Sequence, residues 1–188
     1  MKRLAAILCL AILPACQEGT ADIPQAVTMT ASAVGHFCQM NMLEHPGPKA
    51  QVHLTGLPGT PLFFSQVRDA VAYLRMPEQS HEIAAVYVSD MASAASWEIP
   101  GADNWIPASA AHYVVGSSRT GGMGAPELVP FSDAASAAQF AQQHGGQVQE
   151  LADIPDTAVL APVATSATTP DDDDFADRLR ALSQERTN

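Results

Sequence analysis

The sequence lacks an apolar run that could span a bilayer, a basic surface and the usual catalytic motifs. Its first apolar run, residues 4–13, is ten residues long, whereas a spanning helix needs about 20. The chain has nine Lys and Arg residues and 20 Asp and Glu residues, for a net charge of −11. This acidic balance argues against nucleic-acid binding. Neither a glycine-rich phosphate loop, a Ser-His-Asp order nor a paired-carboxylate pattern is present.

The N-terminal segment has the composition of a lipoprotein signal. Basic residues 2 and 3 precede the apolar run, which ends in Leu13-Pro14-Ala15-Cys16. Such a lipobox directs diacylglycerol to the cysteine thiol and cleavage before it. We therefore predict a signal peptide over 1–15 and a tether over 16–28, with palmitate-type acyl chains on Cys16. An ordinary signal peptide with an incidental cysteine is the weaker alternative, because Cys16 falls where the apolar run stops.

The position after the lipobox cysteine bears on location. Gln17 rather than aspartate follows Cys16. By the sorting rule of Gram-negative bacteria, this favours a lipoprotein that faces the periplasm from the outer membrane over one kept at the inner membrane.

The mature chain then has one unmodified thiol. Cys9 leaves with the signal peptide and Cys16 is capped, so Cys38 has no partner within the chain. An unpaired cysteine in an oxidising compartment requires an explanation. Either Cys38 is buried and inert, or it has a function.

The sequence predicts one compact domain and a tail. The compact part spans residues 29–154, and residues 155–188 are rich in Ala, Thr and Pro and contain four consecutive aspartates at 171–174. Such a composition buries too little apolar surface to offset chain entropy, so we expect a disordered acidic tail. The aspartates form a solvated linker in this interpretation, which we prefer to a metal scavenger.

An internal repeat predicts the fold class. The segments 63–65 and 130–132 both end a short apolar strand at a serine that can cap a helix. Apolar residues then recur with helical spacing at 67, 70, 71 and 74, and at 134, 137, 138 and 141. We predict an α+β domain of two β-β-α-β units. The predicted strands are 50–54, 61–64 and 83–88 in the first unit and 112–116, 128–131 and 147–151 in the second.

Sulfur is concentrated around Cys38, which precedes Met40 and Met42. In an extended segment these three side chains would point to one side. Thiolate and thioether ligands select Cu(I), whereas Zn(II) would require Cys and His residues with tetrahedral spacing. We predict that Cys38 and Met40 are ligands and prefer core filler as the role of Met42.

A second candidate ligand is Met123, which lies between Gly122 and Gly124 and follows Gly121. Glycine is conformationally permissive, and core methionines seldom have such neighbours. The alternative, a loop tip that packs onto the core, stays open.

Five weaker candidates lie near these residues in the predicted fold. His36 can add a fourth ligand or be exposed or capping, and His45 and His53 rank behind it. Asp90 and Met91 end a predicted strand and can face the site from the other side, although an aspartate there often caps a turn.

The combined motifs resemble the NosL family, the accessory lipoproteins of nitrous oxide reductase. The resemblance covers residues 34–152 and rests on the lipobox, Cys38-x-Met40 after Phe37, and four further segments: 86–90, 112–117, Gly122-Met123-Gly124 and 140–146. It implies a Cu(I) metallochaperone for maturation of the reductase's copper centres, working with a membrane ABC-type complex. It also implies two β-β-α-β-like units and places the copper ligands at Cys38, Met40 and Met123. The family often has proline where this chain has Gly122.

Two other functions remain open at this stage. Cys38 could be the nucleophile or protonolysis group of a lyase-like enzyme, which would require a neighbouring base and a lowered thiol pKa. Thioethers neither accept protons nor activate a thiol, so the surrounding methionines argue against this. The third possibility is a structural lipoprotein in which Cys38 is inert.

Overall fold

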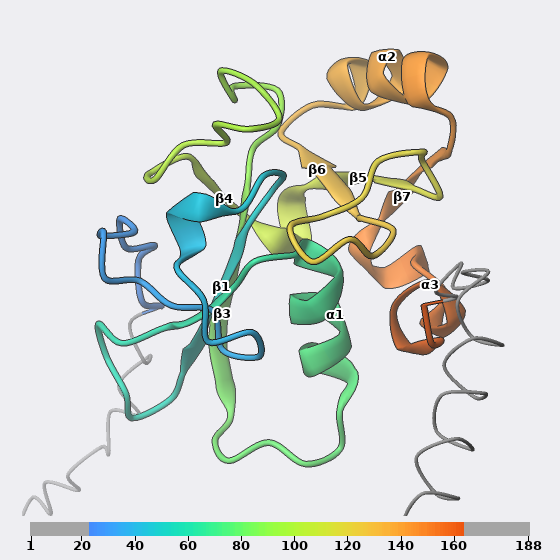
Figure 1. Ribbon diagram of the computed structural model, residues 1–188. Coiled ribbons are helices and arrows are strands. Elements are labelled where there is room, and N and C mark those ends of the chain that lie inside the picture. Colours follow the sequence, from blue (N-terminus) through green and yellow to red (C-terminus); the bar gives the residue numbers. More distant parts are fainter. Residues whose placement is uncertain (1–22, 164–188) are drawn as a thin grey trace, which may run out of the picture.

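The computed structural model describes residues 23–163 (Figure 1). The signal peptide, Cys16, Gln17 and the aspartates at 171–174 lie outside this range. Within residues 23–163, no helix has the length and apolar character needed to cross a membrane.

The first β-β-α-β unit is built on an antiparallel sheet. Its strands are β1 (Ala50–Leu54), β2 (Leu62–Phe64), β3 (Ile83–Ser89) and β4 (Trp105–Pro107), in the order β2-β1-β3-β4. Helix α1 (Val67–Arg75) connects β2 to β3 and contacts β1 and β2. All five residues of the inner strand β1 are buried. One side of the strand faces α1, and on the other side the chain at Val27 covers Gln51.

The second unit repeats the order of the first. Strands β5 (His112–Val115), β6 (Val129–Phe131) and β7 (Gln147–Glu150) form an antiparallel sheet in the order β6-β5-β7, and α2 (Ala134–His144) covers it (Figure 1). The predicted α+β fold with two β-β-α-β units is therefore confirmed. The structure adds β4 and three 3₁₀ helices: η1 (Met42–Glu44), η2 (Ala108–Ala110) and η3 (Leu151–Asp153).

The helices differ from prediction in their caps and in one buried face. The N-cap residues are Gln66 and Asp133, not the preceding serines, and only Asp133 caps through its side chain, by accepting from the Ser136 amide at 2.8 Å.

The apolar face of α1 is buried as predicted through Val67, Ala70 and Val71, with Leu74 half-buried. In α2 the inward residues are Ala137, Phe140 and Ala141, whereas Ala134 and Ala138 are exposed. The large ring of Phe140 decides this orientation because it buries more apolar area than an alanine.

The end of the predicted tether packs onto the first sheet. The buried side chain of Gln51 accepts from the Val27 amide at 2.9 Å and donates to the Val27 carbonyl at 3.0 Å. The hydroxyl of Tyr87 donates to the carbonyl of Pro24 at 2.8 Å. Residues 24–27 therefore belong to the domain.

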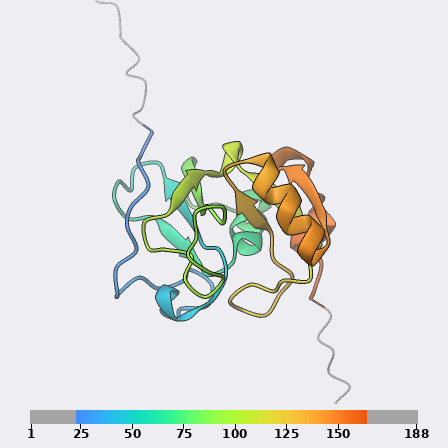
Figure 2. The same ribbon diagram turned by 90° about the horizontal axis from the view of Figure 1, so that it is seen from above.

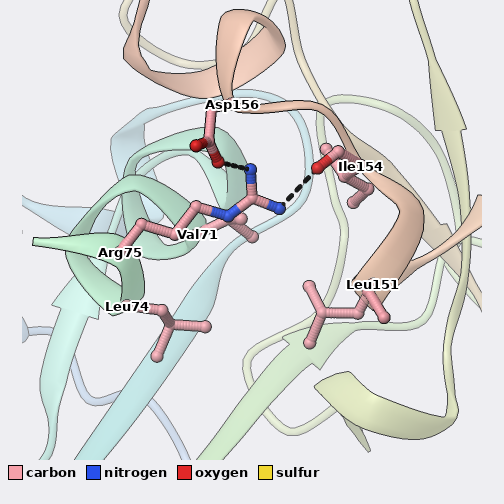
Figure 3. Close-up of a pocket in the computed structure, with 7 residues that line it drawn as sticks. Val71, Leu74, Arg75, Leu151, Ile154 and Asp156 are labelled. Atoms are coloured by element: carbon pink, nitrogen blue, oxygen red, sulfur yellow. Dashed lines mark hydrogen bonds and ion pairs between the residues drawn. The ribbon is translucent and has the colours of Figure 1, made fainter.

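The start of the predicted tail is also part of the domain. Helix α3 (Asp156–Leu160) packs on α1, and Val159 is buried in the main core. Arg75 forms an ion pair with Asp156 and donates to the Ile154 carbonyl (Figure 3). Arg68 likewise donates to the carbonyls of Ala158 and Ala161. The compact part thus extends past residue 154, because Arg68 and Arg75 offer hydrogen-bond donors that the composition of the tail does not reveal. The two described ends leave the domain on opposite sides (Figure 2).

Candidate metal site

Cys38 lies in a tight turn rather than in an extended segment. Val34 and Asn41 pair as an isolated antiparallel bridge, and the Gly35 amide donates to the Met40 carbonyl at 2.9 Å. Gln39 has a φ of 55°, a left-handed conformation uncommon outside glycine. The predicted extended geometry is therefore wrong, because this short hairpin reverses the chain at Cys38.

The three sulfur residues of this segment have different environments. Cys38 is half-buried and Met40 is 46% exposed, whereas Met42 is fully buried against Met29 and Ala33. The Cys38 Sγ occupies the space that a Cβ on Gly35 would take, and the Met42 Sδ lies 3.5 Å from the same point. Gly35 thus allows these two sulfur atoms to approach each other, even though Met42 packs as a core residue.

Met123 is carried by a closed loop. Thr120 and Pro126 pair across its base, the Gly121 amide donates to the Ala125 carbonyl at 2.8 Å, and Gly124 has a φ of 78°. The Met123 side chain is 47% exposed at the tip. The backbone of the loop therefore packs onto the domain while Met123 stays half-exposed.

The turn that carries Cys38 (residues 34–41) and the loop that carries Met123 (residues 120–126), the two sulfur loops, meet at the junction between β2 and α1. The Ser65 hydroxyl lies 3.6 Å from the Cys38 Sγ as a hydrogen-bond donor. The Ser65 carbonyl lies 3.1 Å from the point where Gly122 would carry a Cβ. The next residue, Gln66, accepts from the Met123 amide at 2.9 Å. Cys38 and Met123, which are 85 positions apart in the sequence, are therefore held by two consecutive residues.

Two buried ionisable side chains, Lys49 and Glu127, lie near these loops. The Lys49 Nζ donates to the carbonyls of Pro46 at 2.9 Å and Gly47 at 2.6 Å. Burial lowers the pKa of Lys49 to about 8, although the charges of Glu127 and Cys38 oppose this shift. Burial likewise raises the pKa of Glu127 to about 8, against the hydrogen bonds that its carboxyl accepts from two backbone amides. At neutral pH the Lys49 ammonium is therefore charged and Glu127 is mostly protonated.

The histidine candidates are arranged differently around this region. His36 packs its ring against Phe64 and Tyr73, with centroids 5.6 Å away in each case. His45 lies against Gly122, and its buried Nε2 has no hydrogen-bond partner among residues 23–163. His53 is buried on β1, where its Nε2 lies 2.8 Å from the Gln51 side-chain oxygen.

Asp90 serves a local structural role. Its carboxylate accepts hydrogen bonds from the amides of Ala92 and Ser132 and from the Ser93 hydroxyl, each at 2.9 Å. Burial would raise the pKa of Asp90, but these hydrogen bonds together lower it. Met91 packs against the small core of the second unit. This arrangement is the turn cap named above as the alternative to a metal-facing Asp90.

Sequence reasoning did not identify Ser65, Gln66, Lys49 or Glu127 as parts of the site. Ser65 and Gln66 were visible only as a helix start, and Lys49 and Glu127 only as two of many charges. The available signal was the pair of adjacent glycines at 121 and 122, since such a pair can mark a close approach of two backbones. Among residues 23–163, no group of three or more His, Cys, Asp or Glu side chains is placed to hold a metal.

The fold and site define a small two-unit α+β domain in which the turn that carries Cys38 and the loop that carries Met123 meet at Ser65 and Gln66. The NosL family matches residues 26–159 of the chain. The chain is 58% identical over 175 residues to the copper-binding lipoprotein NosL of Achromobacter cycloclastes, which covers 92% of this chain and 90% of that protein. It is 35% identical to the copper-binding lipoprotein NosL of Stutzerimonas stutzeri over 69% of this chain and 65% of that protein.

A solved structure shares the fold. The copper chaperone NosL from Shewanella denitrificans superposes with a TM-score of 0.64 at 34% identity, over 69% of this chain and 95% of that one. The chain therefore belongs to the NosL family.

Proposed function

We propose that this protein binds Cu(I) through the Cys38 thiolate and the thioethers of Met40 and Met123, and delivers it to maturing nitrous oxide reductase. The observation that carries the proposal is the meeting of the Cys38 turn and the Met123 loop at Ser65 and Gln66. The names of the two relatives and of the solved structure, which describe copper binding or a copper chaperone, support the choice of metal.

The chemistry of the donors favours Cu(I) over harder ions. One thiolate and neutral thioethers are soft ligands, which suit Cu(I). The thiolate also neutralises the single positive charge of the ion, so the bound site is neutral beside the buried Lys49 ammonium. A divalent ion would leave a net positive charge there, which the Lys49 charge disfavours.

The exposure of the thioethers fits a protein that gives its metal away. Met40 and Met123 are 46% and 47% exposed, so a sulfur ligand of a partner can reach the ion without unfolding the site. We propose ligand exchange at these two positions as the route of transfer, with the reductase and its membrane ABC-type complex as the partners.

The proposed location follows from the N-terminal sequence. A lipid on Cys16 would anchor the domain to the periplasmic face of a membrane, and Gln17 favours the outer membrane. Residues 24–27, which contact the Gln51 and Tyr87 side chains of the inner strands β1 and β3, would then join the anchored segment to the first sheet.

The alternative functions gain no support from the described residues. The hydrogen-bond partner of the Cys38 thiol there is the Ser65 hydroxyl, which is a poor base for activating a nucleophile. Cys38 is half-buried rather than fully enclosed, which an inert core thiol would not require.

X-ray absorption spectroscopy of the Cu(I)-loaded protein tests the proposed ligand set. We expect a low coordination number with sulfur dominating the first shell, and a lower sulfur count in Met123→Leu. A first shell of nitrogen and oxygen alone would contradict the proposal.

A further inference from the structure

The side chain of Gln66 makes three hydrogen bonds, two of them to the loop of residues 120–126 that carries Met123 (the methionine loop). Its Oε1 accepts from the amides of Met123 at 2.9 Å and Ala125 at 3.3 Å, and its Nε2 donates to the Asp69 carboxylate at 3.1 Å. The residue is 2% exposed. A buried polar side chain with all these partners strongly favours one orientation, because each lost hydrogen bond would leave a desolvated group unpaired.

We propose that Gln66 is a positioning residue that fixes Met123 where its thioether can join Cys38 in holding the metal. The inference rests on the proposed function and deepens it, since it concerns a residue with no metal-ligating atom of its own. Gln66 acts through the backbone of the ligand: it holds the Met123 amide, and the loop then directs the side chain.

Ser65, which directly precedes Gln66 at the start of α1, contacts the other proposed ligand, Cys38. Ser65 donates toward the Cys38 Sγ at 3.6 Å, and Gln66 follows it directly. The start of α1 therefore sets the position of both sulfur loops relative to one rigid backbone. This preorganisation reduces the conformational freedom that the methionine loop loses on binding.

The glycines of the loop are explained by this docking rather than by flexibility. A Cβ on Gly121 would lie 2.8 Å from the Gln66 Cγ and 2.9 Å from its Oε1, and would also meet the Glu127 Oε2. A Cβ on Gly122 would lie 2.7 Å from the His45 Cβ and 3.1 Å from the Ser65 carbonyl. Both glycines are small so that the loop backbone can lie directly against Ser65 and Gln66.

At position 66, the amide side chain of glutamine suits its surroundings better than a carboxylate or a leucine side chain would. The carbonyl end accepts from the two loop amides, while the NH₂ end meets the Asp69 carboxylate, so the two neighbours orient the group in one sense. A carboxylate at position 66 would be repelled by the Asp69 carboxylate, and a leucine would leave the Met123 and Ala125 amides without their hydrogen-bond acceptor.

A double-mutant cycle on the full mature protein in detergent tests the inference. Cu(I) affinity is measured anaerobically by competition with a bathocuproine-type chelator for wild type, Gln66→Leu, Met123→Leu and the double variant. We expect Gln66→Leu to weaken binding about 10-fold, as for loss of groups that orient a ligand, and to have no further effect when Met123 is already leucine. An equal loss in both backgrounds, or no loss in wild type, would overturn the inference.

Two further variants separate positioning from folding. Gln79→Leu is the matched control: Gln79 donates to the Tyr73 carbonyl at 2.8 Å at the opposite end of α1, so its loss should change stability but leave Cu(I) affinity unchanged. Gly121→Ala keeps glutamine at position 66 but pushes the loop away from it, because the new Cβ would lie 2.9 Å from the Gln66 Oε1. We expect it to weaken Cu(I) binding only when Met123 is present. Unchanged affinity in Gly121→Ala would also count against the inference.

The outcome for Cys38→Ser distinguishes this inference from the proposed function. If Cys38→Ser binds Cu(I) as wild type does, the proposed function fails and the inference fails with it. If Cys38→Ser loses binding but Gln66→Leu does not, only the inference fails. The amide hydrogen exchange of Met123 in the metal-free protein gives a second measurement, and we expect faster exchange in Gln66→Leu.

Discussion

Arg75 on α1 and Asp156 on α3 form an ion pair with 2.6 Å between Nη1 and Oδ1 (Figure 3). The second guanidinium nitrogen of Arg75 donates to the Ile154 carbonyl at 2.7 Å. Arg68, seven residues before Arg75 on the same face of α1, donates to the carbonyls of Ala158 and Ala161. These contacts fasten residues 154–161 to α1. The ion pair itself adds little, because the Asp156 side chain is 75% exposed.

Truncation after Ile154 should therefore destabilise the domain, whereas truncation after Val163 should not. The shorter chain loses Val159, whose burial contributes about 2 kcal/mol. It also leaves the guanidinium of the buried Arg68 without its carbonyl partners. Melting temperature measured for both truncations checks this expectation. Equal melting temperatures would place the domain boundary at residue 154, as the sequence alone predicts.

Anchoring should depend on Cys16. Replacing Cys16 with serine removes the thiol that accepts the lipid, so we expect the variant to appear in the soluble periplasmic fraction without labelled fatty acid. A Cys16→Ser protein that still fractionates with membranes and carries labelled fatty acid would refute the lipobox interpretation.

The methionine ligands should lose affinity without losing stability. Thioethers are neutral and weaker ligands than thiolate, so Met40→Leu and Met123→Leu should each weaken Cu(I) binding about 10-fold. Leucine is close to methionine in volume, so the free energy of unfolding should change by less than about 1.5 kcal/mol. Met76→Leu is the control, because Met76 is 40% exposed at the C-terminal end of α1, away from Ser65. An equal affinity loss in Met76→Leu would show that the effect is not local to the site.

Stability should depend on pH through Glu127. Its pKa is raised from 4.5 to about 8 in the folded protein, so between these values the folded state holds a proton that the unfolded state has released. The free energy of unfolding therefore falls as pH rises through this window, by at most about 1.4 kcal/mol per pH unit from this group. Above pH 8 the contribution is constant.

Glu127→Gln isolates this effect. Glutamine retains an oxygen that can accept from the amides of Arg68 and Leu128, which bond to the Glu127 Oε1 at 3.0 and 2.9 Å, but it does not titrate. Urea unfolding of the metal-free proteins at pH 5, 6 and 7 should show stability falling more steeply with pH in the wild type than in the variant. Parallel pH profiles would mean that Glu127 is ionised in the folded protein.

Patterns that depend on local sequence could be predicted here. The spacing of Val67, Ala70 and Val71 located α1 and its buried face, and the glycines at 145 and 146 marked the end of α2. The predicted buried face of α2 was right for Ala137 and Ala141 but wrong for Ala134 and Ala138, because alanines with helical spacing give a weaker signal than Phe140.

Features set by tertiary contacts could not be predicted. The turn at Cys38 depends on pairing between Val34 and Asn41 and on a left-handed Gln39, which no residue preference in that segment indicates. The role of Gln66 depends on a loop 57 positions away. Residue chemistry identified the candidate sulfur ligands, but the contacts that bring their loops together could be found only in three dimensions.

In the proposed Cu(I) site, Cys38 is the principal ligand. An anaerobic Cu(I) titration of the full mature protein against a bathocuproine-type chelator, in wild type and Cys38→Ser, tests it most directly. The thiolate is the charged and strong ligand, so we expect one Cu(I) bound per wild-type chain and near-complete loss in Cys38→Ser, with the melting temperature of the metal-free protein little changed. Unaltered Cu(I) affinity in Cys38→Ser would contradict the claim.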